Sequence, residues 1–277
     1  MKEKSIKVNG VNMRWLEKGK GPVIILIHGI PTTPELWRNV MPALTNKRRI
    51  AWEMIGYGAS VEEGRSRDIS IGAQAGYLAS WLEAMNMKKV VLAGHDLGGG
   101  VAQIIAALRP EIVQGLVLIN SISYDSWPIP RVKALRALGP LSARLPNAAL
   151  RIAMQALLYE GHATKERAED SLNHYWKHYE HLNAAEALRR QIQHLDVKDT
   201  LAVTDKLREV NIPARIVWGE SDHFQTIDYA ERLAKDLNAP LDRIEGGKHF
   251  VPVDYPRHVV YAIEEVMKDP AFTENKP

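Results

Sequence analysis

The 277-residue chain contains no cysteine. This absence excludes disulfides, metal sites built on thiolates, and cysteine nucleophiles. Long apolar segments are also absent, because the longest apolar stretch, Val23 to Ile27, is far too short to cross a bilayer. The first residues, Met1 to Ser5, lead into no apolar run of signal-peptide length. We therefore expect a cytoplasmic protein that does not bind membranes.

An excess of charge of one sign is missing too. The chain has 36 Lys and Arg against 33 Asp and Glu, a formal net charge of +3, and its longest basic run is Lys47 to Arg49. Nothing in this pattern indicates nucleic-acid binding. With 45% hydrophobic and 25% charged residues, the composition is typical of a globular protein that folds unaided. No pattern indicates a metal or an organic cofactor, and none defines the oligomeric state.

The strand patterns are of two kinds. Residues 8–16 are predicted to form a hairpin around Asn9-Gly10, a dipeptide that favours tight turns between antiparallel strands. Continuous apolar runs, typical of strands buried on both faces of a parallel sheet, occur at Val23–Ile27, Val90–Ala93, Leu116–Ile119 and Arg215–Trp218.

Amphipathic helices are predicted between these strands. Apolar residues recur at helical spacing over 71–85 and over 101–108. Two more helices are predicted near the C-terminus, one with Thr226 as its cap and one that begins at Pro256. Alternating strands and helices predict an α/β fold with a mostly parallel, doubly wound sheet. The last residues, 269–277, are expected to form a frayed tail.

One long segment interrupts this alternation. Residues 126–209 have helical composition, carry several histidines and aromatic residues, and show no strand pattern. We expect a helical cap here, inserted into a core domain that is formed by 1–125 and 210–277.

A glycine-framed turn follows one of the predicted buried strands. Gly94-His95-Asp96-Leu97-Gly98 matches the G-x-S-x-G nucleophile elbow, with an aspartate where serine usually stands. Glycine is needed on both sides because larger side chains would collide with the strained turn. Taken alone, the motif also fits a glycine-rich helix start with an aspartate cap.

Three other segments fall where a hydrolase of this fold needs them. His28-Gly29-Ile30-Pro31 follows a buried strand, so the amides of Ile30 and Leu97 should converge on one oxygen as an oxyanion hole. Asp222 follows the strand that ends at Trp218, and His249 comes after the last strand pattern. Taken singly, His249 also fits a surface histidine and Asp222 a loop cap. Four coincident placements on one α/β pattern favour a catalytic set.

Three motifs resemble those of the α/β-hydrolase epoxide hydrolases and their haloalkane dehalogenase cousins, the branch with an aspartate nucleophile. They are His28-Gly29-Ile30-Pro31, Gly56-Tyr57-Gly58-Ala59-Ser60 and Gly94-His95-Asp96-Leu97-Gly98-Gly99. The resemblance covers nearly the whole chain outside the predicted cap. It implies that Asp96 is the nucleophile, His249 the base, and Asp222 the acid that orients the base.

The acid has one alternative position. In some dehalogenases the acid follows the strand that here ends at Ile119, but this chain has Asn120 at that place. Asp222 is therefore preferred, and Asp125 is the weaker alternative.

An aspartate at the elbow changes the expected reaction. A carboxylate that attacked an ester would form an anhydride, a poor intermediate for ester hydrolysis. Displacement at saturated carbon instead gives an alkyl ester of Asp96, which is hydrolysed when His249 deprotonates a water molecule. We expect a hydrolase whose partners are a small apolar organic substrate and water.

The leaving group distinguishes two enzyme classes. A halide needs N–H donors, and the dehalogenase pattern places Trp or Asn where this chain has Leu97 and Ile30. An epoxide needs an acid, for which the candidates in the cap are Tyr175 and Tyr179, with Tyr159 in reserve. The same tyrosines also fit simple packing of the cap against the core.

The sequence therefore ranks three functions. An epoxide hydrolase that gives a vicinal diol comes first and a haloalkane dehalogenase second. The third is a small-ligand-binding protein that kept the fold without turnover. The chain departs from the epoxide hydrolase pattern in two places. Epoxide hydrolases commonly also carry Trp where Leu97 stands, and their usual cap segment with Tyr followed by Arg is missing.

Overall fold

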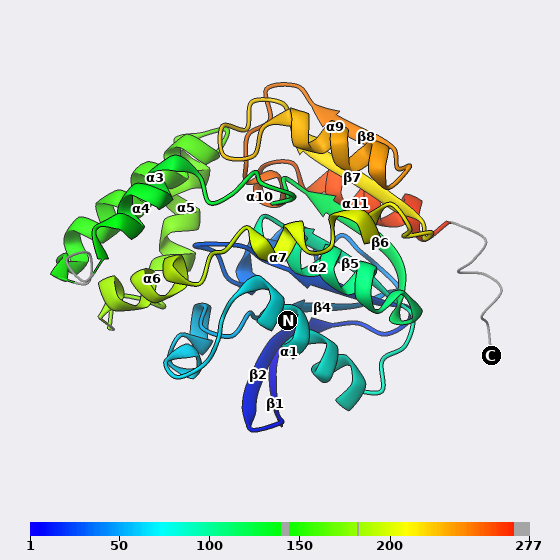
Figure 1. The fold of residues 1–277 in the computed structure, drawn as a ribbon, viewed down its shortest axis with the longest axis horizontal. Helices are drawn as coiled ribbons and strands as arrows, with labels where there is room; N and C mark the ends of the chain where they lie inside the picture. The colour runs from blue at the N-terminus through cyan, green and yellow to red at the C-terminus, as the bar shows by residue number, and fades with distance from the viewer. Residues whose placement is uncertain (140–143, 182, 269–277) are drawn as a thin grey trace.

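A computed structural model describes residues 1–139, 144–181 and 183–268, so the tail predicted at 269–277 lies outside the described residues. The described chain builds one eight-stranded sheet in the order β1-β2-β4-β3-β5-β6-β7-β8, with helices on both faces (Figure 1). The strands are β1 (Lys2–Val8), β2 (Val11–Lys18), β3 (Val23–Ile27), β4 (Arg48–Trp52), β5 (Val90–His95), β6 (Val113–Ile119), β7 (Ala214–Gly219) and β8 (Leu241–Ile244).

The helices of the core lie between and after these strands. They are α1 (Ile71–Ala84), α2 (Leu97–Leu108), α9 (Ile227–Asp236), α10 (Val251–Asp254) and α11 (Pro256–Val266), with short 3-10 helices η1 (Pro34–Arg38), η2 (Gly58–Ser60), η3 (Glu62–Gly64) and η4 (Pro110–Ile112). The two C-terminal helices begin as predicted, at Thr226 as the cap position and at Pro256. The Thr226 side chain, however, makes no capping hydrogen bond.

The predicted hairpin is confirmed. Strands β1 and β2 pair antiparallel, and the turn residues Asn9 and Gly10 have φ angles of 49° and 78°. Both values lie in the left-handed region that a two-residue hairpin turn requires. Strand β2 continues antiparallel to β4, and every later pair of neighbours in the sheet is parallel.

Strands β3, β5, β6 and β7 are largely buried on both faces, as their continuous apolar sequences predict. In β3, Ile25 and Ile27 belong to one hydrophobic cluster while Ile24 and Leu26 belong to the other. The first cluster takes in α1, α2 and α9, and the second takes in η1 and α11. The predicted doubly wound α/β architecture is therefore confirmed.

Strand β4 shows where the pattern of apolar residues fails. Its first two residues are arginines, so the sequence offers no continuous apolar run. Arg49 is nevertheless only 5% exposed, because its guanidinium donates hydrogen bonds to the main-chain carbonyls of Lys18 and Leu44. A basic residue is thus accommodated where the chain itself satisfies its donors.

The segment between β6 and β7 is helical in all of its described residues that have regular structure. It contains α3 (Pro130–Ala137), α4 (Asn147–Gly161), α5 (Lys165–Trp176), α6 (Ala184–Gln193), α7 (Lys198–Leu201) and α8 (Thr204–Leu207). Helices α3 to α6 stand together beside the sheet, and α7 and α8 return along α2 (Figure 1). No helix in the described ranges is both long and apolar enough to span a membrane.

Candidate functional site

The turn between β5 and α2 holds Asp96 in a backbone conformation that side chains rarely adopt. Its φ and ψ are 52° and −121°. A Cβ on Gly94 would lie 2.3 Å from the Gly98 carbonyl oxygen, and one on Gly98 would lie 2.2 Å from that of Ile27. Strand, turn and helix are therefore packed so closely that only glycine fits on either side of Asp96.

The carboxylate of Asp96 lies among backbone amides. Its Oδ2 accepts a hydrogen bond from the Ile30 amide at 2.9 Å, and the side chain is almost fully buried. Burial raises the pKa of the Asp96 carboxyl, although the charge of His249 and the amides of Ile30 and Leu97 oppose the rise. The two amides that the sequence assigns to an oxyanion hole thus both lie at this carboxylate.

Gly29 shows how close this approach is. A Cβ at that position would lie 2.2 Å from Asp96 Oδ2. The loop after β3 can therefore bring the Ile30 amide to the carboxylate only because residue 29 has no side chain.

His249 and Asp222 come together at the ends of β8 and β7. His249 Nδ1 lies 2.8 Å from Asp222 Oδ2, and both residues are buried. Burial disfavours the charged imidazole, but the charge and hydrogen bond of Asp222, together with the charge of Asp96, raise the pKa of His249. This arrangement can hold the ring in one tautomer, with Nδ1–H toward Asp222 and Nε2 free to accept a proton.

The Asp222 carboxylate is fixed by several donors. Its Oδ1 accepts the backbone N–H groups of Phe224 at 2.7 Å and Gln225 at 3.1 Å. Its Oδ2 accepts Asn120 Nδ2 at 2.7 Å. From the sequence alone, Asn120 is only the position at which some dehalogenases carry the acid and this chain does not. The tertiary structure makes it a hydrogen-bond donor to the acid on the neighbouring strand.

The alternative acid, Asp125, is not brought to His249. Asp125 is exposed and accepts a hydrogen bond from the Tyr229 hydroxyl at 3.3 Å. It lies beyond the end of β6 on a turn that leads to the surface. Asp222 is the carboxylate that pairs with His249.

A cavity of about 70 Å³ opens at Asp96 and His249. Its walls come from the core and from the segment between β6 and β7, and they are mostly apolar. The described lining residues are Ile30, Asp96, Leu97, Ile122, Trp127, Pro128, Ile129, Val132, Leu157, Leu195, Phe224, Gln225 and His249. Such a lining suits a small apolar molecule held against one carboxylate and one imidazole.

The three tyrosines predicted as acids are not among the described residues that line this cavity. The Tyr179 hydroxyl is fully buried and hydrogen-bonds to Gln191. The Tyr159 hydroxyl donates to Glu169 at 2.7 Å, at the surface of the cap. Tyr175 is fully buried, and its pKa is raised to about 12 by burial. Helical spacing predicted one helix face for Tyr175 and Tyr179, but α5 ends at Trp176, so Tyr179 lies in the turn that follows the helix. Both side chains pack into one hydrophobic cluster.

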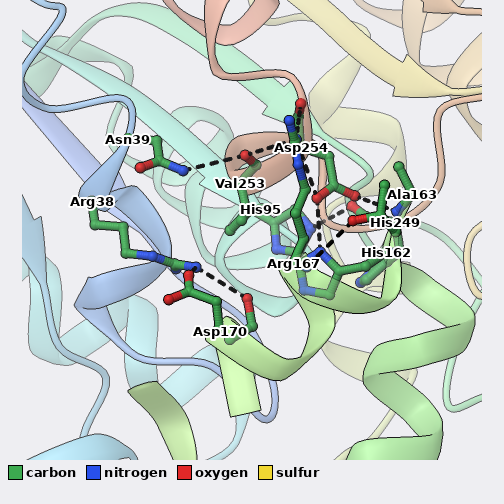
Figure 2. Close-up of polar contacts among 12 residues, drawn as sticks. Arg38, Asn39, His95, His162, Ala163, Arg167, Asp170, His249, Val253 and Asp254 are labelled. Atoms are coloured by element: carbon green, nitrogen blue, oxygen red, sulfur yellow. Dashed lines mark hydrogen bonds and ion pairs between the residues drawn. The ribbon is translucent and has the colours of Figure 1, made fainter. Parts of the chain in front are cut away.

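A second buried His–Asp pair lies close by. His162 Nδ1 is 2.8 Å from Asp254 Oδ1, and Asp254 Oδ2 accepts the Ala163 amide at 2.7 Å. Figure 2 shows this pair together with His95 and His249. The pair joins the end of α4 to α10, and no local sequence pattern predicts it, because 92 residues separate its members.

Metal binding finds no support among the residues described. Within the ranges 1–139, 144–181 and 183–268, no three His, Asp or Glu side chains form a group that could hold a metal ion.

A family model described as alpha/beta hydrolase fold matches residues 22–256 of the chain. The chain belongs to this family. The match spans the elbow, Asp222 and His249, so the superfamily predicted from the motifs is confirmed.

Individual relatives resemble this α/β hydrolase over different shares of its length. The uncharacterized hydrolase YugF of Bacillus subtilis is 26% identical over 274 residues, covering 94% of this chain and 96% of the relative. A haloalkane dehalogenase of Mesorhizobium japonicum is 33% identical over 129 residues, 46% of this chain and 41% of that protein. The structure of epoxide hydrolase CorEH superposes with a TM-score of 0.80 at 21% identity, covering 96% and 98% of the two chains. At that identity the likeness shows the fold alone.

Proposed function

We propose that this hydrolase cleaves a bond at saturated carbon through an alkyl ester on Asp96. The observation that supports it is the position of the Asp96 carboxylate, at the elbow, in contact with the Ile30 amide and in one cavity with His249. In a serine hydrolase a hydroxyl occupies this position. A carboxylate there is a nucleophile for carbon that bears a leaving group.

The reaction has two steps. A carboxylate oxygen of Asp96 attacks the substrate carbon, and the leaving group departs with the bonding electron pair. In the second step His249 Nε2 takes a proton from water, and the hydroxide adds to the Asp96 carbonyl carbon. The amides of Ile30 and Leu97 then stabilise the oxyanion of the tetrahedral intermediate, and protonated His249 gives its proton to the departing alcohol.

Asp222 assists the second step. Its carboxylate keeps the Nδ1–H tautomer of His249 and stabilises the imidazolium that forms. The 2.8 Å contact and the donors that fix Asp222 support this role.

The first candidate substrate is an epoxide, which would give a vicinal diol. The side chains of Leu97 and Ile30, both in the cavity lining, offer no N–H group to hold a halide. A haloalkane is the second candidate, and the partial match to a dehalogenase is the observation that favours it.

In this proposal residues 126–209, which include the helices between β6 and β7, form a cap on a core made of 1–125 and 210–277. Val132, Leu157 and Leu195 come from three separate parts of that segment and all line the cavity. The cap thus selects the substrate while the core supplies the chemistry.

The test uses the variant His249→Gln, which should form the ester but hydrolyse it slowly. The variant is mixed with racemic styrene oxide or with 1-bromobutane, and intact mass spectrometry followed by peptide mapping locates any adduct. We expect a stable mass increase on Asp96 with styrene oxide. The parental protein should release diol without accumulating the adduct, and Asp96→Ala should form none.

The outcomes separate the candidate functions. An adduct with 1-bromobutane alone, with bromide release, would replace the epoxide with the halide. Tight binding of either compound without adduct or product would favour a ligand-binding protein without turnover. An adduct on a residue other than Asp96 would contradict the mechanism.

A further inference from the structure

One polar side chain in the cavity has no part in the scheme above. Among the described lining residues, the polar ones are Asp96, His249, Trp127 and Gln225. Trp127 already donates its Nε1–H to Thr200 Oγ1 at 2.8 Å. The carboxamide of Gln225 is therefore the uncharged polar group available to a bound molecule.

The backbone of Gln225 is held firmly beside the base. Its N–H donates to Asp222 Oδ1 at 3.1 Å, and its carbonyl oxygen accepts Trp218 Nε1 at 2.8 Å. The same carboxylate that fixes the His249 ring thus fixes the loop that carries Gln225.

The Gln225 side chain is buried without being satisfied. The residue is 3% exposed, and Oε1 has no hydrogen-bond partner within the described part of the chain. A buried amide oxygen without a partner is unfavourable, because it has lost its hydrogen bonds to water and gained none in the protein. Rotation about the last side-chain bond exchanges oxygen and NH₂, so the carboxamide can offer either an acceptor or two donors. A bound molecule with an oxygen near the reacting carbon would satisfy it.

We propose that the Gln225 carboxamide holds the ring oxygen of an epoxide and stabilises it as the ring opens. The inference rests on the proposed function and specifies its substrate as one whose leaving atom is an oxygen. Gln225 then does for the leaving oxygen what the predicted tyrosines would have done from the cap, with the difference that it donates a hydrogen bond without giving up a proton.

Ring opening followed by ester hydrolysis conserves atoms and charge. An Asp96 oxygen forms a bond to one ring carbon, the C–O bond at that carbon breaks, and its electron pair stays on the ring oxygen. The Gln225 N–H donates to the resulting alkoxide, which takes a proton from water and leaves hydroxide. Ester hydrolysis later releases one proton, which neutralises that hydroxide, so that the sum is epoxide plus water giving diol.

The test is carried out in the His249→Gln background, where only ester formation is followed. The rate of Asp96 adduct formation from styrene oxide is measured by quenched mass spectrometry over a range of concentrations. We expect Gln225→Met, which keeps the length and removes the amide, to lower the rate at saturation about 10²-fold. The half-saturating concentration should change far less, since the alkoxide forms only in the transition state.

Gln193→Met is the matched control, because it makes the same exchange at an exposed glutamine that hydrogen-bonds to Arg189 and does not line the cavity. It should lower the saturating rate by less than about threefold. Thermal midpoints of all variants are measured alongside, and Gln225→Asn should restore part of the rate by returning an amide.

Each outcome separates the two proposals. If the His249→Gln protein labels Asp96 and Gln225→Met labels it as fast, the Gln225 assignment is overturned while the function stands. A loss confined to the half-saturating concentration would also overturn it, because it shows packing alone. If no styrene oxide adduct forms on Asp96 even with Gln225 present, the epoxide as substrate is ruled out, and the Gln225 assignment fails with it.

Discussion

The molecule contains two buried His–Asp pairs that look alike at the level of single contacts. His249 pairs with Asp222, and His162 pairs with Asp254, each through Nδ1 at 2.8 Å. Both rings also pack on Phe250, His162 stacked at a centroid distance of 4.5 Å and His249 edge-on at 5.0 Å. By distance, burial and aromatic contact alone, neither pair could be chosen as the catalytic one.

Their surroundings differ. His249 lines the cavity that contains Asp96, whose negative charge contributes to the raised pKa of His249. The Nε2 of His162 is buried and has no hydrogen-bond partner among the residues described. Asp254 also accepts the Ala163 amide, and Arg167 lies 3.5 Å from it. The second pair therefore ties the end of α4 to α10. A His–Asp pair needs a nucleophile and room for water beside it before it can act as a base.

The largest expected contrast comes from making the same change in each pair. Asp222→Asn should lower turnover about 10⁴-fold, because asparagine favours the wrong tautomer of the base. Asp254→Asn should leave turnover of the folded protein within about threefold of the parental value, since His162 lies outside the reacting cavity. Diol release from styrene oxide measures both. Equal losses would show that the second pair also takes part in the reaction.

The pH dependence sharpens the contrast further. His249 must be neutral to take a proton from water, and its pKa is raised above the ordinary value of 6.5. Turnover should therefore fall about tenfold per pH unit below a midpoint that lies above 6.5, and reach a plateau on the alkaline side. His162→Gln should not move this midpoint. If His162→Gln moved this midpoint, the fall in turnover at acid pH would belong to the His162–Asp254 pair and not to His249.

The free energy of unfolding should depend more on Asp254 than on Asp222, whereas turnover should depend more on Asp222. Asp254→Ala leaves the buried His162 Nδ1 without an acceptor, which costs about 1–3 kcal/mol, and also removes the acceptor of the partly buried Ala163 amide. Urea unfolding should therefore show a clear loss in the free energy of unfolding. Asp222→Asn keeps oxygen acceptors for Phe224 and Gln225 and should lose less. A more destabilised Asp222→Asn would contradict the assigned roles.

The smallest expected effect concerns the second contact on the catalytic acid. Asn120→Ala removes the 2.7 Å donor to Asp222 Oδ2 and should lower turnover about tenfold. Asp125→Asn is the control, because the exposed Asp125 contacts Tyr229 and is expected to leave turnover unchanged. Loss of activity in Asp125→Asn alone would point to a different acid.

Much of the core could be read from local sequence patterns. Three features depend only on residues that are neighbours in the chain, so the sequence alone predicts them. They are the hairpin at Asn9-Gly10, the continuous apolar strands and the Gly94–Gly98 elbow. The order of Asp96, Asp222 and His249 at strand ends also follows from the parallel sheet, because the carboxyl ends of such strands meet at one edge. Strand β4 was not predicted, because it begins with Arg48 and Arg49 and therefore shows no long continuous apolar run.

The tertiary structure decided what lies around these residues. Helical spacing predicted one face for Tyr175 and Tyr179, but α5 ends at Trp176, and local spacing could not tell whether either side chain meets the cavity or packs elsewhere. The contacts of Asn120 with Asp222 and of His162 with Asp254 span 102 and 92 residues, and no local rule relates such positions. No local pattern distinguishes Gln225 from other loop residues. Its place at the cavity depends on the hydrogen bonds of its backbone with Trp218 and Asp222. The sequence by itself determined the fold and the order of the reactive groups, since both follow from local periodicity and chain direction. Which side chains line the cavity depends on how the helices between β6 and β7 pack against the sheet and its loops, and only the tertiary structure specifies that packing.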